Sequence, residues 1–157
     1  PYGYSGLGEI SVFIFFGLVA TLGTYFVQVE TLSADVFLAS IAMGSFACAI
    51  LVLNNLRDRT KDELAGKRTL AVVMGETGTR DLYRWVIFAT FAVVALLIFT
   101  SFYFVITLFA LPLAARLVRG VKSGSSGKDL IPLLAATGRL QMLYSALISL
   151  AALLAAR

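Results

Sequence analysis

The chain has no histidine, a single cysteine and few charged side chains. Without histidine, these 157 residues cannot supply a histidine general base, a His-ligated zinc or a Ser-His-Asp triad. The single cysteine, Cys48, excludes an intrachain disulfide and a metal site made of several thiolates. Any chemistry is therefore left to carboxylates, lysine, arginine and tyrosine.

Charged residues are too scarce for an ordinary soluble fold. They make up 14% of the chain, against about 25% in a typical soluble domain, whereas apolar residues make up 59%. Because so few charges cannot coat a globule of this size, the composition predicts an all-α integral membrane protein. The chain begins with Pro1 and shows no signal-peptide pattern, so we expect a piece of a longer protein.

Uncharged runs predict five transmembrane helices. Two of the runs have the length of about 20 residues that crosses a hydrocarbon core. The uncharged run 85–115 is too long for one span, so we expect a hairpin that turns near Thr100 and Ser101. The expected spans, which form one domain over 1–157, are 10–29, 36–56, 82–100, 101–118 and 132–156.

Basic residues between these spans predict the sidedness. Seven lie between the uncharged runs 36–56 and 85–115 and four between residues 115 and 130, whereas the connection from Glu30 to Asp35 has none. Since cytoplasmic loops carry the excess of lysine and arginine, we expect a multi-pass protein of the cell membrane with both basic loops cytoplasmic. The net charge of +4 is thereby explained, and no nucleic-acid partner is expected.

The connection 54–80 contains the most informative pattern, which begins at Asn54 with NNLRDRTKDELAGKRTLAV. On a helix that continues from the second span, the i, i+4 and i+8 positions of Asn54, Asp58 and Asp62 share one face. Gly66 is expected to end this helix, because glycine readily adopts positive φ. Two cations then follow the two aligned carboxylates.

This combination is typical of a magnesium–diphosphate site. Magnesium is commonly held by one or two carboxylates together with substrate phosphates and water. Lys67 and Arg68, directly after Gly66, can neutralise the remaining phosphate charge.

Residues 54–72 resemble the second aspartate-rich motif of the UbiA superfamily of intramembrane prenyltransferases. The paired asparagines and the GKRTLAV ending are most similar to the members that act on 1,4-dihydroxy-2-naphthoate in menaquinone biosynthesis. The resemblance implies a bundle of about nine transmembrane helices, of which this chain supplies the C-terminal part. A first aspartate-rich motif would lie upstream and is not in this chain, so the chain alone is expected to be inactive.

The same resemblance implies an activity and a set of site residues. The activity is Mg²⁺-dependent transfer of a polyprenyl group from polyprenyl diphosphate to 1,4-dihydroxy-2-naphthoate, with decarboxylation, giving demethylmenaquinone. Asp58 and Asp62 would hold Mg²⁺, and Asn54 and Asn55 would line the site. The residues implied to bind phosphate oxygens are Lys67, Arg68, Arg57 and Lys61.

Two polar residues within the predicted spans have two interpretations each. Tyr25 either shelters an allylic cation by cation–π attraction or anchors the far end of the first span at the membrane interface. Arg139 either reaches inward to an acidic or phosphate partner, which we favour, or extends to the lipid headgroups.

Other readings of the motif remain open at this stage. In a solvated helix, Asp58 would pair with Lys61, and Arg59 would pair with Asp62 or Glu63. The whole chain could also be another aromatic prenyltransferase of the superfamily or a transporter half-bundle. A non-catalytic domain whose basic loops bind anionic lipid is a further alternative.

Overall fold

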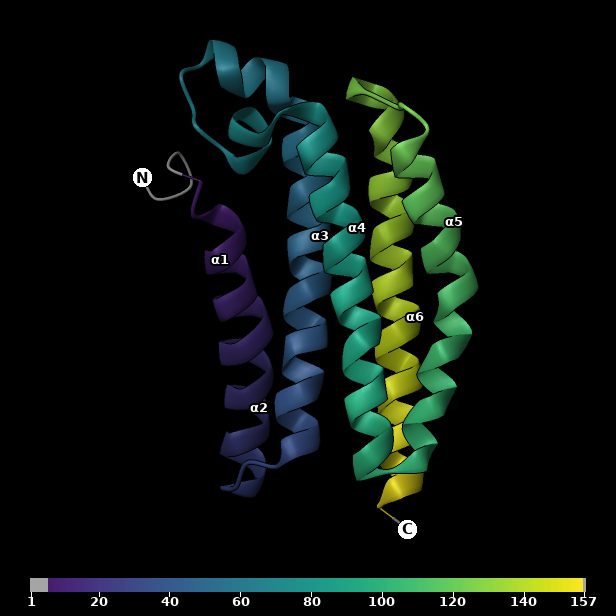
Figure 1. The fold of residues 1–157 in the computed structure, drawn as a ribbon. Coiled ribbons are helices and arrows are strands. Elements are labelled where there is room, and N and C mark those ends of the chain that lie inside the picture. Colours follow the sequence, from purple (N-terminus) through teal and green to yellow (C-terminus); the bar gives the residue numbers. More distant parts are fainter. Residues whose placement is uncertain (1–5, 157) are drawn as a thin grey trace.

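In the computed structural model, which describes residues 6–156, the chain is a bundle of membrane-length helices (Figure 1). Five helical segments within these residues are long and apolar enough to cross a bilayer, which confirms the predicted all-α membrane fold. The first combines α1 (Gly8–Val12), the π-helical stretch η2 (Phe13–Val19) and α2 (Ala20–Val29). The others are α3 (Ala34–Leu64), α4 (Leu70–Thr100), η3 (Phe102–Ala110) with α5 (Leu111–Lys122), and η4 (Gly127–Leu130) with α6 (Ile131–Ala155).

Local sequence signals set several helix ends. Ser101 is extended, with φ −159° and ψ 133°, and separates α4 from η3 at the position where the sequence predicts a hairpin turn. Thr69 caps α4, because its hydroxyl accepts a hydrogen bond of 3.4 Å from the backbone amide of Val72. Pro112 and Pro132 lie in the first turns of α5 and α6, where a helix tolerates the missing backbone donor.

The long helix α3 lies between the first span and the rest of the bundle (Figure 1). On one side η2 approaches it closely, since a Cβ on Gly17 would lie 2.5 Å from the Cα of Gly44. On the other side Tyr144 of α6 packs edge-to-face against Phe46 of α3 and Phe91 of α4, with ring centroids 5.1 and 5.7 Å away. The first span is therefore joined to the bundle through α3.

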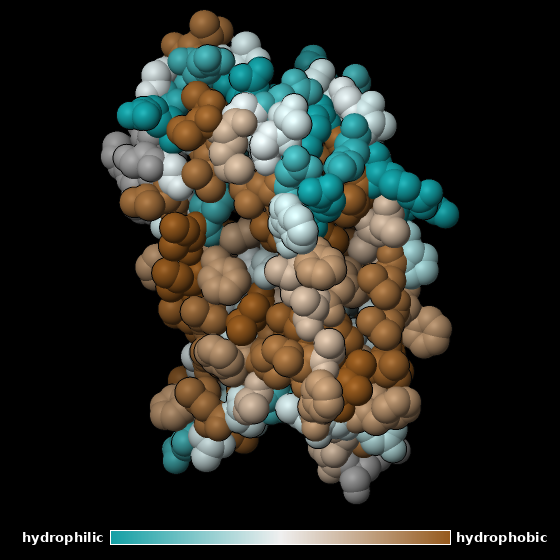
Figure 2. All heavy atoms as spheres, in the orientation of Figure 1, coloured by the Kyte–Doolittle hydropathy of each residue, from teal (hydrophilic) through white to brown (hydrophobic). Residues whose placement is uncertain are grey.

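Hydropathy divides the surface into a polar end and a long apolar body (Figure 2). Polar side chains gather at the end where α3 finishes, α4 begins and α5 connects to α6. Large apolar side chains such as Phe15, Phe88 and Phe99 are exposed on the body. This distribution suits helices surrounded by lipid, and it places the charged motif at one mouth of the bundle.

The helix α4 begins further into the polar end than the sequence predicts. Within the connection 54–80, α3 continues to Leu64, as expected for a helix that Gly66 ends, but α4 already begins at Leu70, ahead of the expected span 82–100. Only Gly75, with φ 69° and ψ −177°, interrupts the helical path near the start of α4. Charged residues end an apolar run without ending a helix, because lysine, arginine and glutamate are good helix formers. The carboxylates are consequently held on a regular helix.

Candidate active site

The turn after α3 is built by Gly66, as the sequence predicts. Gly66 has φ 71°, and its amide donates to the Glu63 carbonyl at 3.1 Å. The amide of Lys67 donates to the Asp62 carbonyl at 2.9 Å. These two bonds form a Schellman motif, in which a glycine with positive φ reverses the chain at the end of a helix. The reversal carries Lys67 back beside the last turn of α3.

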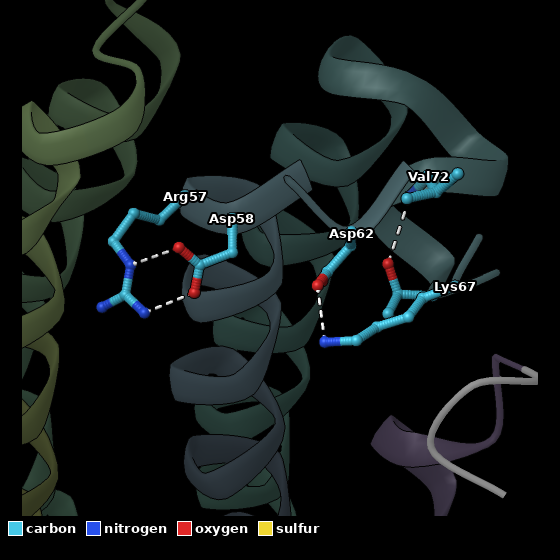
Figure 3. Close-up of polar contacts among 6 residues, drawn as sticks. Arg57, Asp58, Asp62, Lys67 and Val72 are labelled. Carbon is cyan, nitrogen blue, oxygen red and sulfur yellow. Dashed lines mark hydrogen bonds and ion pairs between the residues drawn. The ribbon is translucent and has the colours of Figure 1, made fainter. Parts of the chain in front are cut away.

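Each carboxylate of the motif is paired with a cation (Figure 3). Arg57 donates to both oxygens of Asp58, from Nε at 3.1 Å and from a terminal nitrogen at 2.5 Å. The Lys67 ammonium donates to Asp62 Oδ1 at 2.8 Å. Asp62 is only 7% exposed, so its charge is partly withdrawn from water and depends on this partner. The motif thus forms two adjacent ion pairs along α3.

The observed pairing differs from that of the solvated-helix alternative. Asp58 is bonded to Arg57 and not to Lys61, and Asp62 is bonded to Lys67, which lies beyond the helix. Among the ion pairs described for residues 54–68, the pair of Arg59 with Glu63, at 3.6 Å, is the one that follows the i, i+4 pattern of that alternative. The two aspartates therefore belong to a cluster that the chain reversal completes, and not simply to a charged helix surface.

The region carries more positive than negative charge. Residues 57–68 contain five cations and three carboxylates. Of the predicted phosphate ligands, Lys61 and Arg68 have exposed side chains. Arginine and lysine in this number favour an anionic ligand, because the carboxylates present do not neutralise all of them.

The two asparagines have different surroundings. The Asn55 amide donates to Glu9 Oε1 at 2.9 Å, and Glu9 is buried at the start of the first span. Asn54 instead lines a cavity of about 470 Å³ between the first span, α3 and α6. Asn55 thus ties the first span to α3, whereas Asn54 is available to a ligand.

The cavity beside Asn54 is mostly apolar. Its walls include Val12, Phe16 and Leu51, and Gln141 of α6 contributes a second amide. Ala47, Ile50, Leu51 and Asn54 are successive cavity residues on α3, and Asp58 follows Asn54 by one turn on the same face. The carboxylates thus follow, along α3, the residues that line this apolar cavity.

Arg57 and Lys61 border a second cavity, of about 420 Å³, at the polar end of the bundle. Arg59, Glu76 and Arg80 also line it. The buried Arg80 guanidinium is already bonded to Glu76 and to the backbone carbonyls of Val121 and Ser125. The four predicted phosphate ligands are therefore divided: Lys67 pairs with Asp62, Arg57 and Lys61 face this cavity, and Arg68 is exposed next to Lys67.

The structure does not bring Tyr25 to the carboxylates. Tyr25 lines a cavity with Asp35, Val36 and Ala39 at the opposite end of α3. The 1.5 Å rise per residue puts Ala39 and Asp58 roughly 30 Å apart along that helix. This position matches the interfacial interpretation of Tyr25 better than the cation-sheltering one.

Arg139 is exposed on α6. Within residues 6–156 it forms no ion pair, so the inward partner that we expected is not found in the described part of the chain.

A metal ion would need ligands from outside the described protein atoms. Within residues 6–156, no three acidic or cysteine side chains are grouped closely enough to hold an ion. Asp58 and Asp62, one helical turn apart, nevertheless offer the one or two carboxylates with which proteins hold Mg²⁺ when substrate phosphates supply the other oxygens. The donor set therefore fits Mg²⁺ bound jointly with a diphosphate.

Glu9 and Gln141 are the polar residues that the sequence did not assign to the site. Glu9 is the partner of Asn55, and Gln141 faces Asn54 across the apolar cavity. Glu9 lies at the edge of an apolar run, and Gln141 lies inside one. In such runs a polar side chain is the only feature of the sequence that indicates a functional position. That signal gives no partner, because the contacts are made between separate helices.

Comparison with known proteins gives one family. The UbiA prenyltransferase family matches residues 1–134. The 1,4-dihydroxy-2-naphthoate octaprenyltransferase of Mycobacterium tuberculosis is 42% identical over 145 residues, which are 92% of this chain and 50% of that protein. A protein of the same name from Haemophilus influenzae is 37% identical over 161 residues, which are 98% of this chain and 51% of that protein. No solved structure matches the chain significantly.

The chain spans about half the length of the curated relatives it matches. The family match nevertheless covers most of its residues, including the entire carboxylate motif and the Gly66 turn. With five membrane-length helices and this motif at one mouth of the bundle, the chain belongs to the UbiA prenyltransferase family.

Proposed function

We propose that the protein transfers a polyprenyl group from polyprenyl diphosphate to 1,4-dihydroxy-2-naphthoate, with loss of carbon dioxide, to form demethylmenaquinone. The observation that carries this proposal is the pair of carboxylates, Asp58 and Asp62, held beside cations on α3, whose preceding turns line an apolar cavity. The relatives' names supply the aromatic acceptor and the isoprenoid donor. The whole protein's activity is proposed here, and this chain supplies one part of its site.

Asp58 and Asp62 would hold Mg²⁺ together with the donor diphosphate. When bound, the ion stabilises the negative charge of the leaving diphosphate. The ion pairs seen in the structure then have a clear role, since Arg57 and Lys67 hold the two carboxylates in position before the ligand arrives. On binding, the same two cations can turn to phosphate oxygens, with exposed Arg68 adding a further donor.

The apolar cavity beside Asn54 would hold the reacting allylic end of the donor and the naphthoate ring. Its low polarity excludes water, which would otherwise capture the allylic cation. Asn54 and Gln141 are the two amides in its wall, and each can hydrogen bond to a hydroxyl or carboxylate of the acceptor. The ring carbon that carries the carboxylate would then attack the allylic carbon of the donor as diphosphate leaves. Loss of carbon dioxide from that ring carbon would follow.

We also propose that the polar end faces the cytoplasm in the cell membrane. The exposed residues Thr31 and Ser123 lie in connections at opposite ends of the bundle (Figure 1). An impermeant thiol reagent applied outside intact cells should label Thr31→Cys and spare Ser123→Cys, because basic connections stay inside. Labelling of Ser123→Cys from outside would contradict the proposed orientation.

The activity is tested with the whole protein in membranes, supplied with polyprenyl diphosphate and with 1,4-dihydroxy-2-naphthoate labelled in the carboxyl group. We expect a prenylated naphthoquinol product and release of the label as carbon dioxide. A chelator should stop both, and added Mg²⁺ should restore both. If the protein prenylates a different aromatic acceptor and not this one, it is another prenyltransferase of the family. If polyprenyl diphosphate crosses the membrane and no product forms, a transporter is favoured.

A further inference from the structure

A groove between α4 and α5 has a composition unlike that of the candidate active site. It encloses about 330 Å³, and seven of its nine lining residues are apolar. The two exceptions are Arg84 on α4 and Arg119 on α5. In Figure 1, α5 lies at the edge of the bundle away from α1 and α2, so this groove opens on a different side from the cavity beside Asn54.

The cations of this groove are incompletely neutralised. Arg84 lies 3.3 Å from Asp81, and the Lys122 ammonium is 4.0 Å from the same carboxylate oxygen. Arg119 donates from Nε to the Ala115 carbonyl of its own helix at 3.3 Å, and its side chain is exposed. Within residues 6–156, Asp81 is the one carboxylate paired with these three cations. The polar mouth therefore has an excess of two positive charges.

Aromatic side chains indicate the depth in the membrane at which the polar end of the groove, with Arg84 and Arg119, lies. Trp85 packs edge-to-face with Phe88 at 5.8 Å, and the two are 58% and 61% exposed. The Arg84 guanidinium lies 5.1 Å from the Trp85 ring centroid. Tryptophan is enriched at the level of lipid headgroups, so Arg84 and Arg119 lie where phosphates are found. Phe91 and Val118 continue the groove as apolar wall.

We propose that this groove binds an anionic phospholipid, with an acyl chain against Phe88, Phe91 and Val118 and the phosphate between Arg84 and Arg119. An apolar groove facing the bilayer is filled by a hydrocarbon chain, since water has no hydrogen-bonding partner there. Two excess cations at the headgroup level select an anionic lipid over a zwitterionic one. This lipid is distinct from the substrates of the proposed reaction, and its binding does not depend on that reaction.

The test is native mass spectrometry of the full chain in detergent, titrated with phosphatidylglycerol or with phosphatidylcholine of the same acyl chains. We expect phosphatidylglycerol to bind at least about tenfold more tightly. The double variant Arg84→Ala/Arg119→Ala should lose this preference, because each charge-assisted bond contributes roughly a decade of affinity. The matched control is Arg116→Ala/Lys128→Ala, which removes two exposed cations from the same end of the bundle outside the groove.

A third variant, Ala115→Phe, fills the groove at an exposed position and keeps both arginines. It should also weaken phosphatidylglycerol binding, and helical circular dichroism confirms that each variant is folded. Equal losses in the two double variants would show diffuse charge attraction and overturn the proposal. If Ala115→Phe binds phosphatidylglycerol with full affinity, the acyl chain does not lie in this groove, and the proposal is overturned. If a polyprenyl phosphate displaces phosphatidylglycerol preferentially, the groove is an isoprenoid site, and the phospholipid proposal is overturned.

Discussion

Replacing Asp62 by asparagine in the whole protein, of which this chain is a part, is expected to lower prenyl transfer at least about 100-fold without preventing membrane insertion. The amide keeps the shape of the side chain and can still accept a hydrogen bond from Lys67, which now lies 2.8 Å from Asp62. It lacks the charge that Mg²⁺ requires, and loss of about 3 kcal/mol of transition-state stabilisation corresponds to this factor. Asp58→Asn should have a similar effect, and the measurement is the initial rate at saturating Mg²⁺.

Glu63→Gln is the matched control for these variants. Glu63 follows Asp62 on α3, but its side chain is 60% exposed and is paired only with Arg59 at 3.6 Å. Because an exposed pair of this kind contributes little, its removal should leave the rate nearly unchanged. Wild-type turnover in Asp62→Asn, or an equal loss of rate in Glu63→Gln, would mean that the two aspartates are only part of an ordinary charged helix surface.

Removing the Lys67 ammonium should weaken donor binding far more than acceptor binding. Each lost charge-assisted hydrogen bond to diphosphate contributes about 1.5–3 kcal/mol, so Lys67→Ala should lower polyprenyl diphosphate affinity by roughly one to two decades. The naphthoate has no diphosphate, and its affinity should change much less. Arg68→Ala should act in the same direction. The measurement is equilibrium binding of each substrate in detergent with Mg²⁺ present.

Two further variants separate ligand binding from general effects of charge. Lys128→Ala removes an exposed cation from the same end of the bundle, beyond the motif, and should leave donor affinity unchanged. Lys67→Arg keeps the charge and should retain much of the affinity. An equal loss of both substrates in Lys67→Ala would mean that the turn at Gly66 had collapsed, and no loss of either would favour the transporter or structural readings.

Much of the fold follows from the sequence because membrane helices are subject to simple limits. Span length fixes the number of helices, and the two basic connections require the uncharged run 85–115 to turn back on itself. The structure places that turn at Ser101. Gly66 could be assigned as the end of α3 because few residues other than glycine adopt its positive φ. These features depend on local chemistry or on the bilayer.

The partners within the site could not be predicted in the same way. The sequence offers Lys61 one turn from Asp58, yet Arg57 takes that carboxylate, and side-chain rotamers decide between them. The bond between Asn55 and Glu9 joins residues 46 positions apart and depends on how the first span packs against α3. The π-helical stretch Phe13–Val19 likewise has no local signal in an apolar run. None of the three can be deduced from the local sequence.

The central claim is that Asp58 and Asp62 bind the donor diphosphate through Mg²⁺, and binding of a non-hydrolysable polyprenyl thiolodiphosphate tests it most directly. The affinity of the whole protein should be measured with and without Mg²⁺, for the wild type and for Asp58→Asn/Asp62→Asn. We predict that Mg²⁺ tightens binding to the wild type at least about tenfold and has little effect on the double variant. Weaker, Mg²⁺-independent binding should persist there through Lys67 and Arg68. The same Mg²⁺ enhancement in both proteins would contradict the account.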